Sequence, residues 1–599
     1  MSAIFVNDAG QLVVSCPYES RKVVKSAGGK WDAVVRKWTL AFSPAAVERL
    51  IDNLPDPQVH PDVEKVLVET IEREKKLRKI RAMSSVDHPV RLKVPGLTGA
   101  LYNYQKLGVM FALANGRGVL IADEMGLGKT LQAIATALFL KERGEISEAL
   151  IVVPPSLKYN WAIEIEKWTK ESYVVVDGAP DDRVAQWLKK DVFFYVVNFE
   201  LLLEDLFGGK EYKAKEDETK QQLVEREAKI ARAQRRARIL APVRERMWGL
   251  IAVDEAQALK SALSKRTMNV RRLRGRFRMA LTGTPMDGRL EELHSLMEFV
   301  CPGLLGSRTV FLQRHAETDV FGKVVKYKRV GEVREKIAPH FLRRLKKDVL
   351  DDLPDKVYSN RMVELTGQEK KVYKELAGHG HAATEDAAAL VACIRCKQFC
   401  DSPSLLADAL EKAEEVDEKE VKKLRKMKES KLDALRDVLQ EVVVDNAHKV
   451  LVFSQYASMV KVLMRVFDEM GLKYLCIWGD TPKKERAEYQ QRFNTDRTID
   501  LMVGTEAMSA GLNFTAADYV INYDDNWAPA FMAQREDRAH RIGQKNTVTV
   551  INFVCVDTIE ERIRTVLYQK SKISAQALGD DLDEMVLKRL GPKDTAKLL

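Results

Sequence analysis

The residues from Asp123 to Thr130 (Asp-Glu-Met-Gly-Leu-Gly-Lys-Thr) have the composition of a phosphate-binding loop. They follow the apolar run Gly118–Ala122 and precede apolar residues at helical spacing. Glycines let backbone N–H groups close around phosphate oxygens, and a helix N-terminus adds partial positive charge. The Lys129 ammonium can reach the β and γ phosphates, while the Thr130 hydroxyl can ligate Mg²⁺. The stretch predicts a nucleotide site, although Asp123 stands where the common motif has its first glycine; a chance glycine-rich turn is the alternative.

A pair of carboxylates, Asp254 and Glu255, comes directly after the apolar run Leu250–Val253. Burying such charges is costly unless a cation lies beside them. Asp254 is suited to hold Mg²⁺, directly or through water, and Glu255 to orient and deprotonate an attacking water. A solvated acidic strand end is the alternative, and it is weaker beside a phosphate loop. The pair therefore predicts hydrolysis of a nucleoside triphosphate.

Two arginines, Arg538 and Arg541, lie three positions apart in the segment Gln534–Gln544, and on a helix they would share a face. Phosphoryl transfer needs a cation where charge spreads over the γ-phosphate. Arginines supplied by a second lobe would make hydrolysis depend on closure of the lobes. A surface ion-pair face is the alternative for such a pair taken alone.

The elements that must position these groups form two repeating series of short apolar runs and helical stretches. Such alternation predicts parallel sheets with helices on both faces. We therefore expect an α/β fold with two parallel-sheet lobes. The runs of the first lobe are Gly118–Ala122, Leu150–Val153, Val192–Val197, Leu250–Val253 and Met279–Thr282, and those of the second are Val450–Phe453, Tyr474–Ile477, Leu501–Val503, Tyr519–Asn522 and Val548–Val554.

Outside the lobes we expect a small N-terminal α+β module with a helix capped by Ser43 and a hairpin over Trp31–Phe42. Three prolines after residue 54 indicate a linker before a charged helix. The expected organisation is the module (1–55), a linker and charged helix (56–94), lobe one (95–302, with an insertion at 208–247), helical protrusions and an inter-lobe linker (303–431), lobe two (432–575) and a tail (576–599).

Composition excludes several classes of protein. The 599 residues are 46% hydrophobic, which is too apolar for a disordered or fibrous chain. Nothing approaches about 18 consecutive apolar residues, and the N-terminus has no signal-peptide pattern, so no membrane association is expected. Seven cysteines are too few for a disulfide scaffold and favour a reducing interior. We expect an intracellular monomer, cytoplasmic if bacterial or phage and nuclear if eukaryotic.

Two basic stretches fit a polyanionic partner. Residues 210–246 contain twelve Lys and Arg and seven Asp and Glu. Their net charge of +5 is half of the chain's net charge of +10. A solvated helical hairpin and an arm that faces nucleic acid are the alternatives there. Residues 260–278 begin with Lys260 and contain no acid; phosphate contacts are their expected use, and a solvated helix is the alternative for each residue. Cys393, Cys396 and Cys400 could be read as a metal site, but they lie at helical spacing without a nearby fourth ligand.

Taken together, these motifs resemble the Swi/Snf-type branch of the superfamily-two helicase-related ATPases, whose phosphate loop begins with Asp-Glu. The resemblance spans about residues 95–570 and implies two RecA-like lobes with helical insertions, ATP and Mg²⁺ as ligands, and sequence-independent binding of duplex or forked DNA. Further matches in order are Leu101–Val109, Val152–Leu157 with Asn160–Trp161, Val197–Glu200, Leu281–Pro285, Phe341–Lys356, Ile394–Pro403, Lys449–Tyr456, Gly479–Arg486, Gly504–Asp518 and Asn526–Pro529.

The resemblance assigns roles to individual positions. Catalysis falls to Lys129, Asp254, Glu255, Arg538 and Arg541, and Mg²⁺ to Thr130 and Asp254. Nucleotide binding falls to Gln105 as the adenine reader, Gln534, and the loop residues Asp123, Glu124, Met125, Gly126, Leu127, Gly128, Lys129 and Thr130. The nucleic-acid contacts implied are Pro154, Ser156, Asn198, Lys260, Gln455, Gly511 and Trp527.

One departure concerns the subgroup. Many relatives have a Gly-Gly pair where this chain has Met508-Ser509. The annealing-helicase subgroup, which remodels replication forks in repair and replication, also lacks that pair. Residues 28–42 resemble the HARP module of the same subgroup. The sequence thus predicts a DNA-dependent ATPase that tracks along duplex DNA. A strand-separating helicase and an ATP-driven switch acting on a protein partner, such as RNA polymerase, are the alternatives.

Overall fold

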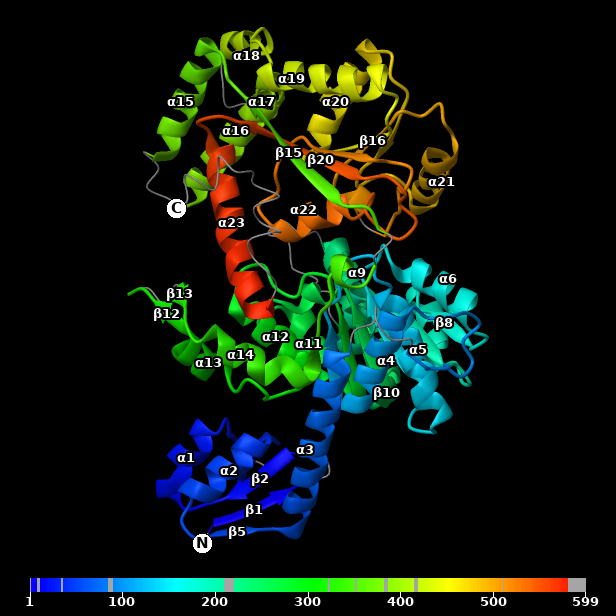
Figure 1. Cartoon of the computed structure of the whole chain (residues 1–599), viewed down its shortest axis with the longest axis vertical. Helices are drawn as coiled ribbons and strands as arrows, with labels where there is room; N and C mark the ends of the chain where they lie inside the picture. Colours follow the sequence, from blue (N-terminus) through cyan, green and yellow to red (C-terminus); the bar gives the residue numbers. More distant parts are fainter. Residues whose placement is uncertain are drawn as a thin grey trace. The chain divides into compact units, whose positions relative to one another are not determined.

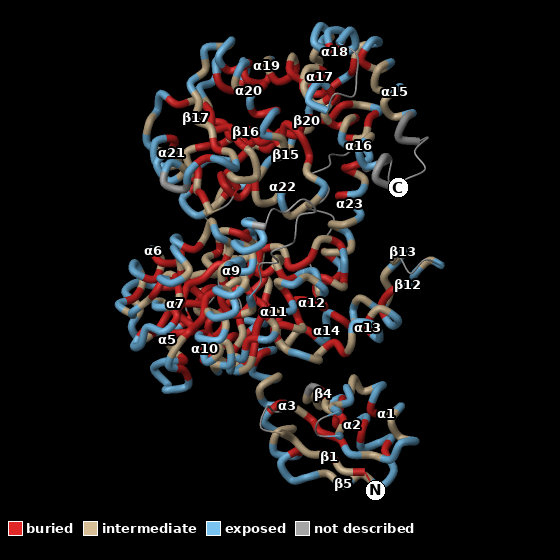
Figure 2. Tube along the Cα trace, turned by 180° about the vertical axis from the view of Figure 1, so that it is seen from behind, coloured by how far each residue is buried: buried red, intermediate tan, exposed pale blue. Residues whose placement is uncertain are grey.

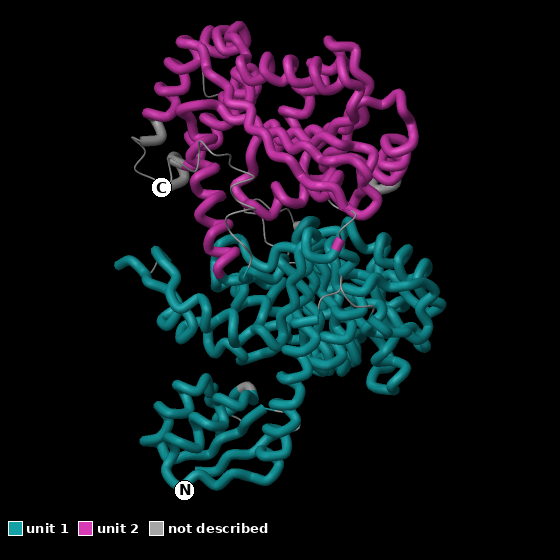
Figure 3. Tube along the Cα trace, in the orientation of Figure 1, with its two compact units in different colours: residues 1–349, 577–579 teal, residues 350–576, 580–599 magenta. Residues whose placement is uncertain are grey.

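The computed structural model describes residues 2–7, 11–33, 36–83, 90–208, 220–320, 324–350, 353–381, 386–413, 418–509 and 511–579. They form two compact units, one within residues 1–349 with 577–579 and the other within residues 350–576 (Figure 3). Each unit holds one large parallel sheet (Figure 1). The expected α/β class with two parallel-sheet lobes and a small α+β module is confirmed.

The N-terminal module is a five-stranded sheet in the order β3-β4-β2-β1-β5. Alternate side chains of its strands, including Ile4, Leu12 and Leu40, point to one buried face, where helix residues Val24 and Val47 pack against them. The Ser43 side chain accepts a hydrogen bond from the Ala46 N–H and caps α2, as predicted. The elements are β1 (Ser2–Val6), β2 (Gln11–Ser15), α1 (Arg21–Ser26), β3 (Lys30–Asp32), β4 (Lys37–Ala41), α2 (Pro44–Asn53) and β5 (Pro57–Val59).

The segment expected to be a linker is structured. Pro57–Val59 pairs in parallel with β1, which completes the sheet of the module. Helix α3 (Pro61–Ala82) then places Val63 in the core of the module and Leu77 in the core of lobe one. Pro57 stands at the first position of an edge strand and Pro61 at the start of a helix, where neither needs its missing N–H.

Lobe one has a seven-stranded, wholly parallel sheet in the order β14-β6-β11-β10-β7-β9-β8. Figure 2 shows buried residues gathered in the interior of this lobe, among its helices. The elements are α4 (Asn103–Asn115), β6 (Gly118–Ile121), α5 (Lys129–Glu142), β7 (Ala149–Val153), α6 (Lys158–Trp168), β8 (Tyr173–Val175), α7 (Pro180–Leu188), β9 (Phe194–Asn198), α8 (Phe199–Phe207), α9 (Lys220–Ile239), α10 (Ala241–Glu245), β10 (Met247–Asp254), α11 (Lys265–Arg272), β11 (Arg274–Leu281), α12 (Leu290–Val300), α13 (Arg308–His315), β12 (Ala316–Thr318), β13 (Val324–Tyr327), α14 (Val330–Ile337) and β14 (Phe341–Leu342).

Lobe two has a six-stranded parallel sheet in the order β15-β20-β19-β16-β18-β17. Along β16, Val450 and Val452 join one apolar cluster and Leu451 and Phe453 join another, so both faces of the sheet are covered. The elements are β15 (Lys356–Val363), α15 (Gly367–His381), α16 (Asp386–Asp401), α17 (Pro403–Lys412), α18 (Glu418–Arg425), α19 (Ser430–Leu439), β16 (Val450–Phe453), α20 (Ala457–Glu469), β17 (Tyr474–Ile477), α21 (Lys483–Thr495), β18 (Leu501–Gly504), β19 (Tyr519–Asn522), α22 (Pro529–Glu536), β20 (Val548–Cys555) and α23 (Ile559–Leu578).

The region 303–431, expected to be helical, also contributes to both sheets. Strand β14 pairs with β6 in lobe one, and β15 pairs with β20 in lobe two. The sequence pattern did not reveal these strands, because β14 has two residues and β15 alternates exposed and half-buried positions instead of forming an apolar run. Cys396 and Cys400 lie buried on α16, and Cys393 is half-buried on the same helix.

The insertion consists, in its described part, of the single long helix α9 followed by the short α10; residues 209–219 of the expected hairpin lie outside the described residues. Helix α9 packs on α8 and exposes Arg232, Arg235 and Arg238. Arg236 instead turns inward and pairs with Glu204 at 3.6 Å. Among the described residues, no helix has the length and apolarity to span a membrane.

Candidate active site

The phosphate-loop residues join β6 to the first turn of α5, as predicted. Gly126 and Gly128 have φ values of 86° and 71°, a left-handed region in which side chains other than glycine are strained. Lys129 is the first residue of α5, and its ammonium donates to the carbonyls of Asp123 (2.8 Å) and Glu124 (3.2 Å). Thr130, next in the helix, is half-buried. The loop therefore presents a lysine, a hydroxyl and a helix N-terminus together.

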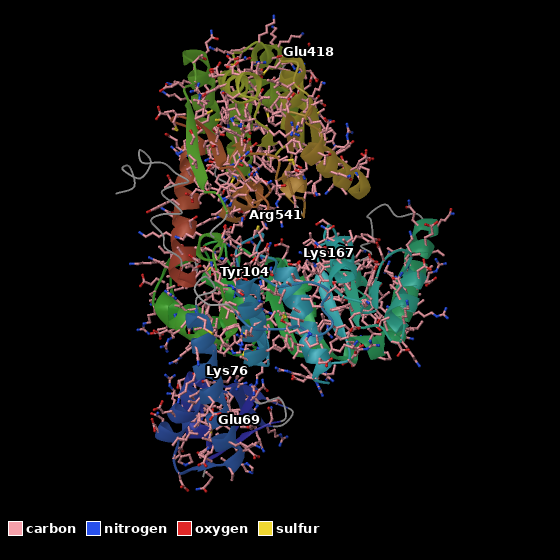
Figure 4. The ribbon with its side chains drawn as sticks, turned by 45° about the vertical axis from the view of Figure 1, so that its right-hand side comes forward. Glu69, Lys76, Tyr104, Lys167, Glu418 and Arg541 are labelled. Atoms are coloured by element: carbon pink, nitrogen blue, oxygen red, sulfur yellow. The ribbon has the colours of Figure 1, made fainter. Side chains whose placement is uncertain are left out.

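Gln105 of helix α4 lies against this loop. Its side-chain Nε2 donates to the Leu127 carbonyl at 3.3 Å, and its Oε1 accepts from the Tyr102 N–H at 3.0 Å. A Cβ at Gly128 would lie 2.4 Å from that Nε2, so the close approach requires glycine there. Figure 4 labels Tyr104, which neighbours Gln105 on α4. The structure thus brings the expected adenine reader to the phosphate loop.

The remaining loop side chains contact protein. Asp123 is completely buried, Met125 and Leu127 are buried, and a Cβ at Gly283 would lie 2.6 Å from the Met125 side chain. Glu124 is half-buried, and its Oε2 accepts from the Lys346 N–H at 2.8 Å. These four side chains are therefore engaged within the lobe, and their backbone groups are what the loop can offer a nucleotide.

The two carboxylates stand at the end of β10, whose neighbours in the sheet are β11 and β7. Asp254 accepts from the Trp161 indole N–H at 2.8 Å and from the Glu255 N–H at 2.8 Å. Burial, and then the charge of Glu255, raise the pKa of Asp254 to about 6, while the two hydrogen bonds and Lys129 act in the opposite direction. A carboxylate held charged in such surroundings gains from a nearby cation.

Glu255 has a left-handed backbone, with φ of 48°, and begins a chain of hydrogen bonds. Gln257 donates to Glu255 at 2.7 Å and accepts from the Thr282 hydroxyl at 2.7 Å, and that hydroxyl accepts from the Thr284 N–H at 3.0 Å. A strained non-glycine residue at such a position is typical of a functional site. The chain fixes the carboxylate of Glu255 through β11 and the loop that follows it.

These features fit ATP with Mg²⁺. The loop supplies a helix N-terminus and a lysine for phosphate oxygens, and Asp254 supplies a carboxylate whose pKa is raised chiefly by burial. The hydroxyl of Thr130 follows directly on Lys129. Nucleotide, divalent cation and an activated water therefore all have protein groups of the right chemistry in lobe one.

The expected arginines belong to the other compact unit. Helix α22 ends at Glu536, so the prediction that Arg538 and Arg541 share a helix is wrong. The reason is that the Arg538 carbonyl accepts from the Phe514 N–H at 2.8 Å and cannot continue the helix. The two side chains nevertheless converge, because Arg538 donates to the Leu512 carbonyl (2.9 Å) and Arg541 to the Asn513 side chain.

Gln534 lies within α22, and its carbonyl accepts from Arg538 Nε at 3.1 Å. Gly511, with φ of 72°, begins the segment that both arginines contact. Trp527 is 41% exposed. The side-chain amide of Gln455 accepts from Lys397 at 2.9 Å and donates to the Asp525 carbonyl at 3.3 Å. Gln455 is therefore engaged within lobe two.

Four further predicted nucleic-acid residues lie in lobe one. Pro154 and Ser156 are half-buried after β7, and Lys260 forms an ion pair with Glu292 at 3.8 Å. Asn198 is buried at the end of β9; its amide donates to Glu200 at 2.8 Å, and its Oδ1 has no hydrogen-bond partner among the described residues. The set thus gathers after strands β7, β9 and β10.

The basic stretch 260–278 is used partly inside the lobe. Arg271 donates to the Ser295 carbonyl at 2.6 Å, and Arg278 donates to the carbonyls of Phe299 and Leu273 at 3.1 and 2.9 Å. Burial lowers the pKa of both guanidinium groups. These two arginines are engaged with backbone carbonyls of α12 and its surroundings, and phosphate contacts by the stretch stay a prediction.

Sequence reasoning missed a buried ionic network in lobe two. Arg535 is completely buried and donates to Glu506 at 2.7 and 3.1 Å and to the Asp524 carbonyl at 2.7 Å. Lys431 lies between Asp401 (3.0 Å) and Glu560 (2.5 Å). Charges within apolar stretches were the available signal, but their partners are far apart in the sequence.

Comparison with known proteins gives the family. The SNF2-related domain matches residues 102–405, and the helicase conserved C-terminal domain matches residues 430–543. The putative ATP-dependent helicase/translocase YwqA of Bacillus subtilis is 31% identical over 84% of this chain and 51% of its own length. The nuclear protein STH1/NPS1 of Saccharomyces cerevisiae is 29% identical over 80% of this chain and 35% of its own length.

Among solved structures, the Sulfolobus solfataricus SWI2/SNF2 ATPase core in complex with dsDNA aligns with 83% of this chain and 98% of its own, at 26% identity and a TM-score of 0.37. The chain spans about half the length of the B. subtilis relative and less of the yeast one. Because the SNF2-related domain covers just over half of its residues and the phosphate loop, the carboxylate pair and two parallel sheets accompany it, the chain belongs to the SNF2-related family.

Proposed function

We propose that the protein is a DNA-dependent ATPase that hydrolyses ATP to ADP and phosphate and uses the energy to move along duplex DNA. The observation that carries the proposal is the meeting of Lys129, Asp254 and Glu255 at the end of one parallel sheet, beside the loop from Asp123 to Thr130. The name of the B. subtilis relative, a putative ATP-dependent helicase/translocase, agrees with it.

Each group has a part in hydrolysis. Lys129 exchanges the loop carbonyls it now contacts for phosphate oxygens, which are stronger acceptors for an ammonium. Glu255 orients the attacking water and takes its proton, and Gln257 keeps the carboxylate in place. Thr130 and Asp254 hold a divalent cation, which when bound neutralises charge on the phosphate oxygens. Gln105 receives the adenine.

Arg538 and Arg541 complete this set from lobe two. We infer that they reach the γ-phosphate in a closed state, so that hydrolysis depends on lobe movement and the grip on DNA changes with each turnover. The contacts with DNA are to phosphates and are independent of sequence, because basic side chains and backbone amides carry them. Fork remodelling or strand annealing is the finer role that we propose, on the grounds of Met508-Ser509 and the N-terminal module.

The ATPase rate should be measured without DNA and with single-stranded, blunt duplex and forked DNA. We expect duplex and fork to stimulate hydrolysis. Glu255→Gln should bind ATP but lose nearly all turnover, and Lys129→Ala should lose both. Stimulation by single strands alone would favour a strand-separating helicase, and a rate that DNA leaves unchanged would favour a switch acting on a protein partner. Wild-type turnover in Glu255→Gln would refute the site itself.

A further inference from the structure

Arg344 contacts the first residue of the phosphate loop and two neighbouring helices. It follows β14, and its side chain is 12% exposed. Its Nε donates to Asp123 Oδ1 at 2.9 Å, and its Nη2 bonds to the second oxygen of the same carboxylate. Nη2 also donates to Gln132 Oε1 at 2.9 Å, and Nη1 donates to the Tyr104 carbonyl. One guanidinium thus joins the loop, α5 and α4.

The Asp123 carboxylate accepts hydrogen bonds from this guanidinium and from the Gln132 amide. It is completely buried, and Gln132 Nε2 donates to its Oδ2 at 2.9 Å. Both carboxylate oxygens therefore accept from the charged Arg344, and Oδ2 also accepts from the neutral Gln132 amide, all within lobe one. This explains why an aspartate stands where the common phosphate-loop motif has glycine: it anchors the start of the loop to a buried cation.

The lack of a side chain at Gly108 leaves room for the side chains of Gln132 and Arg344. A Cβ at this position of α4 would lie 1.8 Å from Gln132 Oε1 and 2.8 Å from an Arg344 nitrogen. Contacts so short do not occur between real atoms, so a larger residue would displace the group. Helix α4, which carries Gln105, is held against the loop at this point.

The backbone after β14 adds a second attachment. The Ala122 N–H donates to the Leu342 carbonyl at 2.7 Å, and the Glu124 N–H donates to the Arg344 carbonyl at 2.9 Å. Arg343 donates to the Ala122 carbonyl at 2.9 Å and the Gly283 carbonyl at 3.2 Å. The phosphate loop is thereby fixed at its first residues by a segment more than two hundred positions away in the sequence.

We propose that Arg344 is a positioning residue for the nucleotide: through Asp123, Gln132 and the Tyr104 carbonyl it holds the phosphate loop and the helix of Gln105 in the shape that binds ATP. It touches no reacting atom. The inference deepens the proposed function and rests on it. Lysine cannot replace arginine here, because one ammonium cannot reach both carboxylate oxygens, the amide and the carbonyl at the same time.

The test compares this pair with a matched one. Arg183 and Asp205 form an equally buried, bidentate pair between α7 and α8, with distances of 2.7–3.0 Å, and neither residue belongs to the candidate site. The variants are Arg344→Gln, Arg344→Lys, Asp123→Asn and the double variant, with Asp205→Asn as the control. The readouts are Tm, the Kd of a fluorescent ATP analogue, kcat against KM, and amide hydrogen exchange of residues 123–130 without nucleotide.

We expect Arg344→Gln and Asp123→Asn to raise Kd and KM about tenfold or more, since small displacements in a positioned site are costly. The double variant should have a Kd no higher than that of the single variant with the lower affinity, because both substitutions remove the same ion pair. Arg344→Lys should not restore affinity. Asp205→Asn should lower Tm comparably yet leave Kd unchanged. Loop exchange should rise in the Arg344 and Asp123 variants alone.

Wild-type affinity and wild-type loop exchange in folded Arg344→Gln, or in Asp123→Asn should the former not fold, would overturn the inference. An equal rise of Kd in Asp205→Asn would do the same, because the effect would then be general destabilisation. Failure of the proposed function looks different: wild type and Lys129→Ala would bind the analogue equally. Loop exchange, measured without nucleotide, reports on the Arg344 contact in either case.

Discussion

At the scale of single residues, the pKa of Asp254 connects the structure with a measurable rate. Burial raises this pKa to about 6, so the carboxyl group is protonated below that pH and charged above it. Only the charged form can hold a cation with ATP. The dependence of kcat/KM on pH reports the ionisation in the free enzyme, so kcat/KM should decline about tenfold per pH unit below pH 6.

Trp161→Phe tests that assignment. The Trp161 indole N–H donates to Asp254 and lowers its pKa, so removal of this donor raises the pKa further. We expect the acid limb of kcat/KM to move to higher pH, with the rate at pH 8 nearly retained. Trp168→Phe is the control, because Trp168 lies on the same helix and donates to Glu164 instead. An acid limb that moves equally in both variants, or in neither, would contradict the role of Asp254.

Arg541→Ala separates nucleotide binding from turnover. In lobe two, Arg541 donates to the Asn513 side chain, and it is proposed to act only at the γ-phosphate. We expect Kd for ATP and for DNA to stay near wild type, while kcat falls about 10³-fold, the effect typical of such arginines. Arg538→Ala should behave similarly. Weakened ATP binding with unchanged kcat would show that the arginine binds substrate in its ground state instead.

At the scale of elements, the N-terminal module has a small core that depends on few large side chains. Trp38 on β4 is 8% exposed and packs in that core, whereas its neighbour Trp31 on β3 is 53% exposed. The two rings are in edge contact, with centroids 5.4 Å apart. A domain of about 60 residues is marginally stable, so loss of one such side chain is a large fraction of its stability.

Trp38→Ala should therefore unfold the module and leave the lobes folded. The free energy of unfolding of the module should fall by about 3–5 kcal/mol. Denaturant unfolding measures it, with protease cleavage within residues 1–60 as the signal for the module. Trp31→Ala, the matched control, should cost much less. If the module recognises forks, Trp38→Ala should reduce the ATPase rate with forked DNA more than with blunt duplex. An equal reduction with both substrates would refute that role.

Helix α9 decides between the two alternatives for the insertion. Arg232 and Arg235 are exposed, while Arg236 pairs with Glu204. We expect Arg232→Gln/Arg235→Gln to keep the ATPase rate without DNA, because α9 packs on α8 and carries none of the candidate site residues. For a DNA-facing arm, the dependence of DNA affinity on salt should weaken by about 0.9 in log–log slope per lost phosphate contact. An unchanged dependence of DNA affinity on salt would favour the alternative that α9 is a solvated helix.

At the scale of the whole molecule, the two parallel sheets and their loops favour movement along duplex over strand separation. Separation requires a wedge where the strands part. In lobe two, the described residues between β16 and β20 form the sheet strands β17, β18 and β19, the helices α20, α21 and α22 and the loops that join them, and no long inserted hairpin occurs there. The additional mass of the chain lies in α9 and in the elements between Arg308 and Arg425.

We therefore expect ATP-dependent displacement of the third strand from a DNA triplex, with little unwinding of a tailed duplex. The triplex and the tailed duplex should carry the same label, and each should be assayed with the wild type and with Glu255→Gln. The variant should displace no strand from either substrate. Efficient unwinding of the tailed duplex, together with no stimulation of the ATPase by blunt duplex, would contradict tracking and favour the helicase.

The α/β class, most strands of both lobes and the phosphate loop with its carboxylates could be predicted from the sequence, because they depend on local signals: apolar runs, glycines and adjacent charges. The pairing of Asp123 with Arg344, 221 positions away, and the membership of β14 and β15 in different sheets became visible only in the folded structure. The structure also shows that Arg538 lies beyond the end of α22, where its carbonyl accepts a hydrogen bond from the Phe514 N–H. Each of these features rests on hydrogen bonds between distant segments, for which a one-dimensional pattern carries no signal.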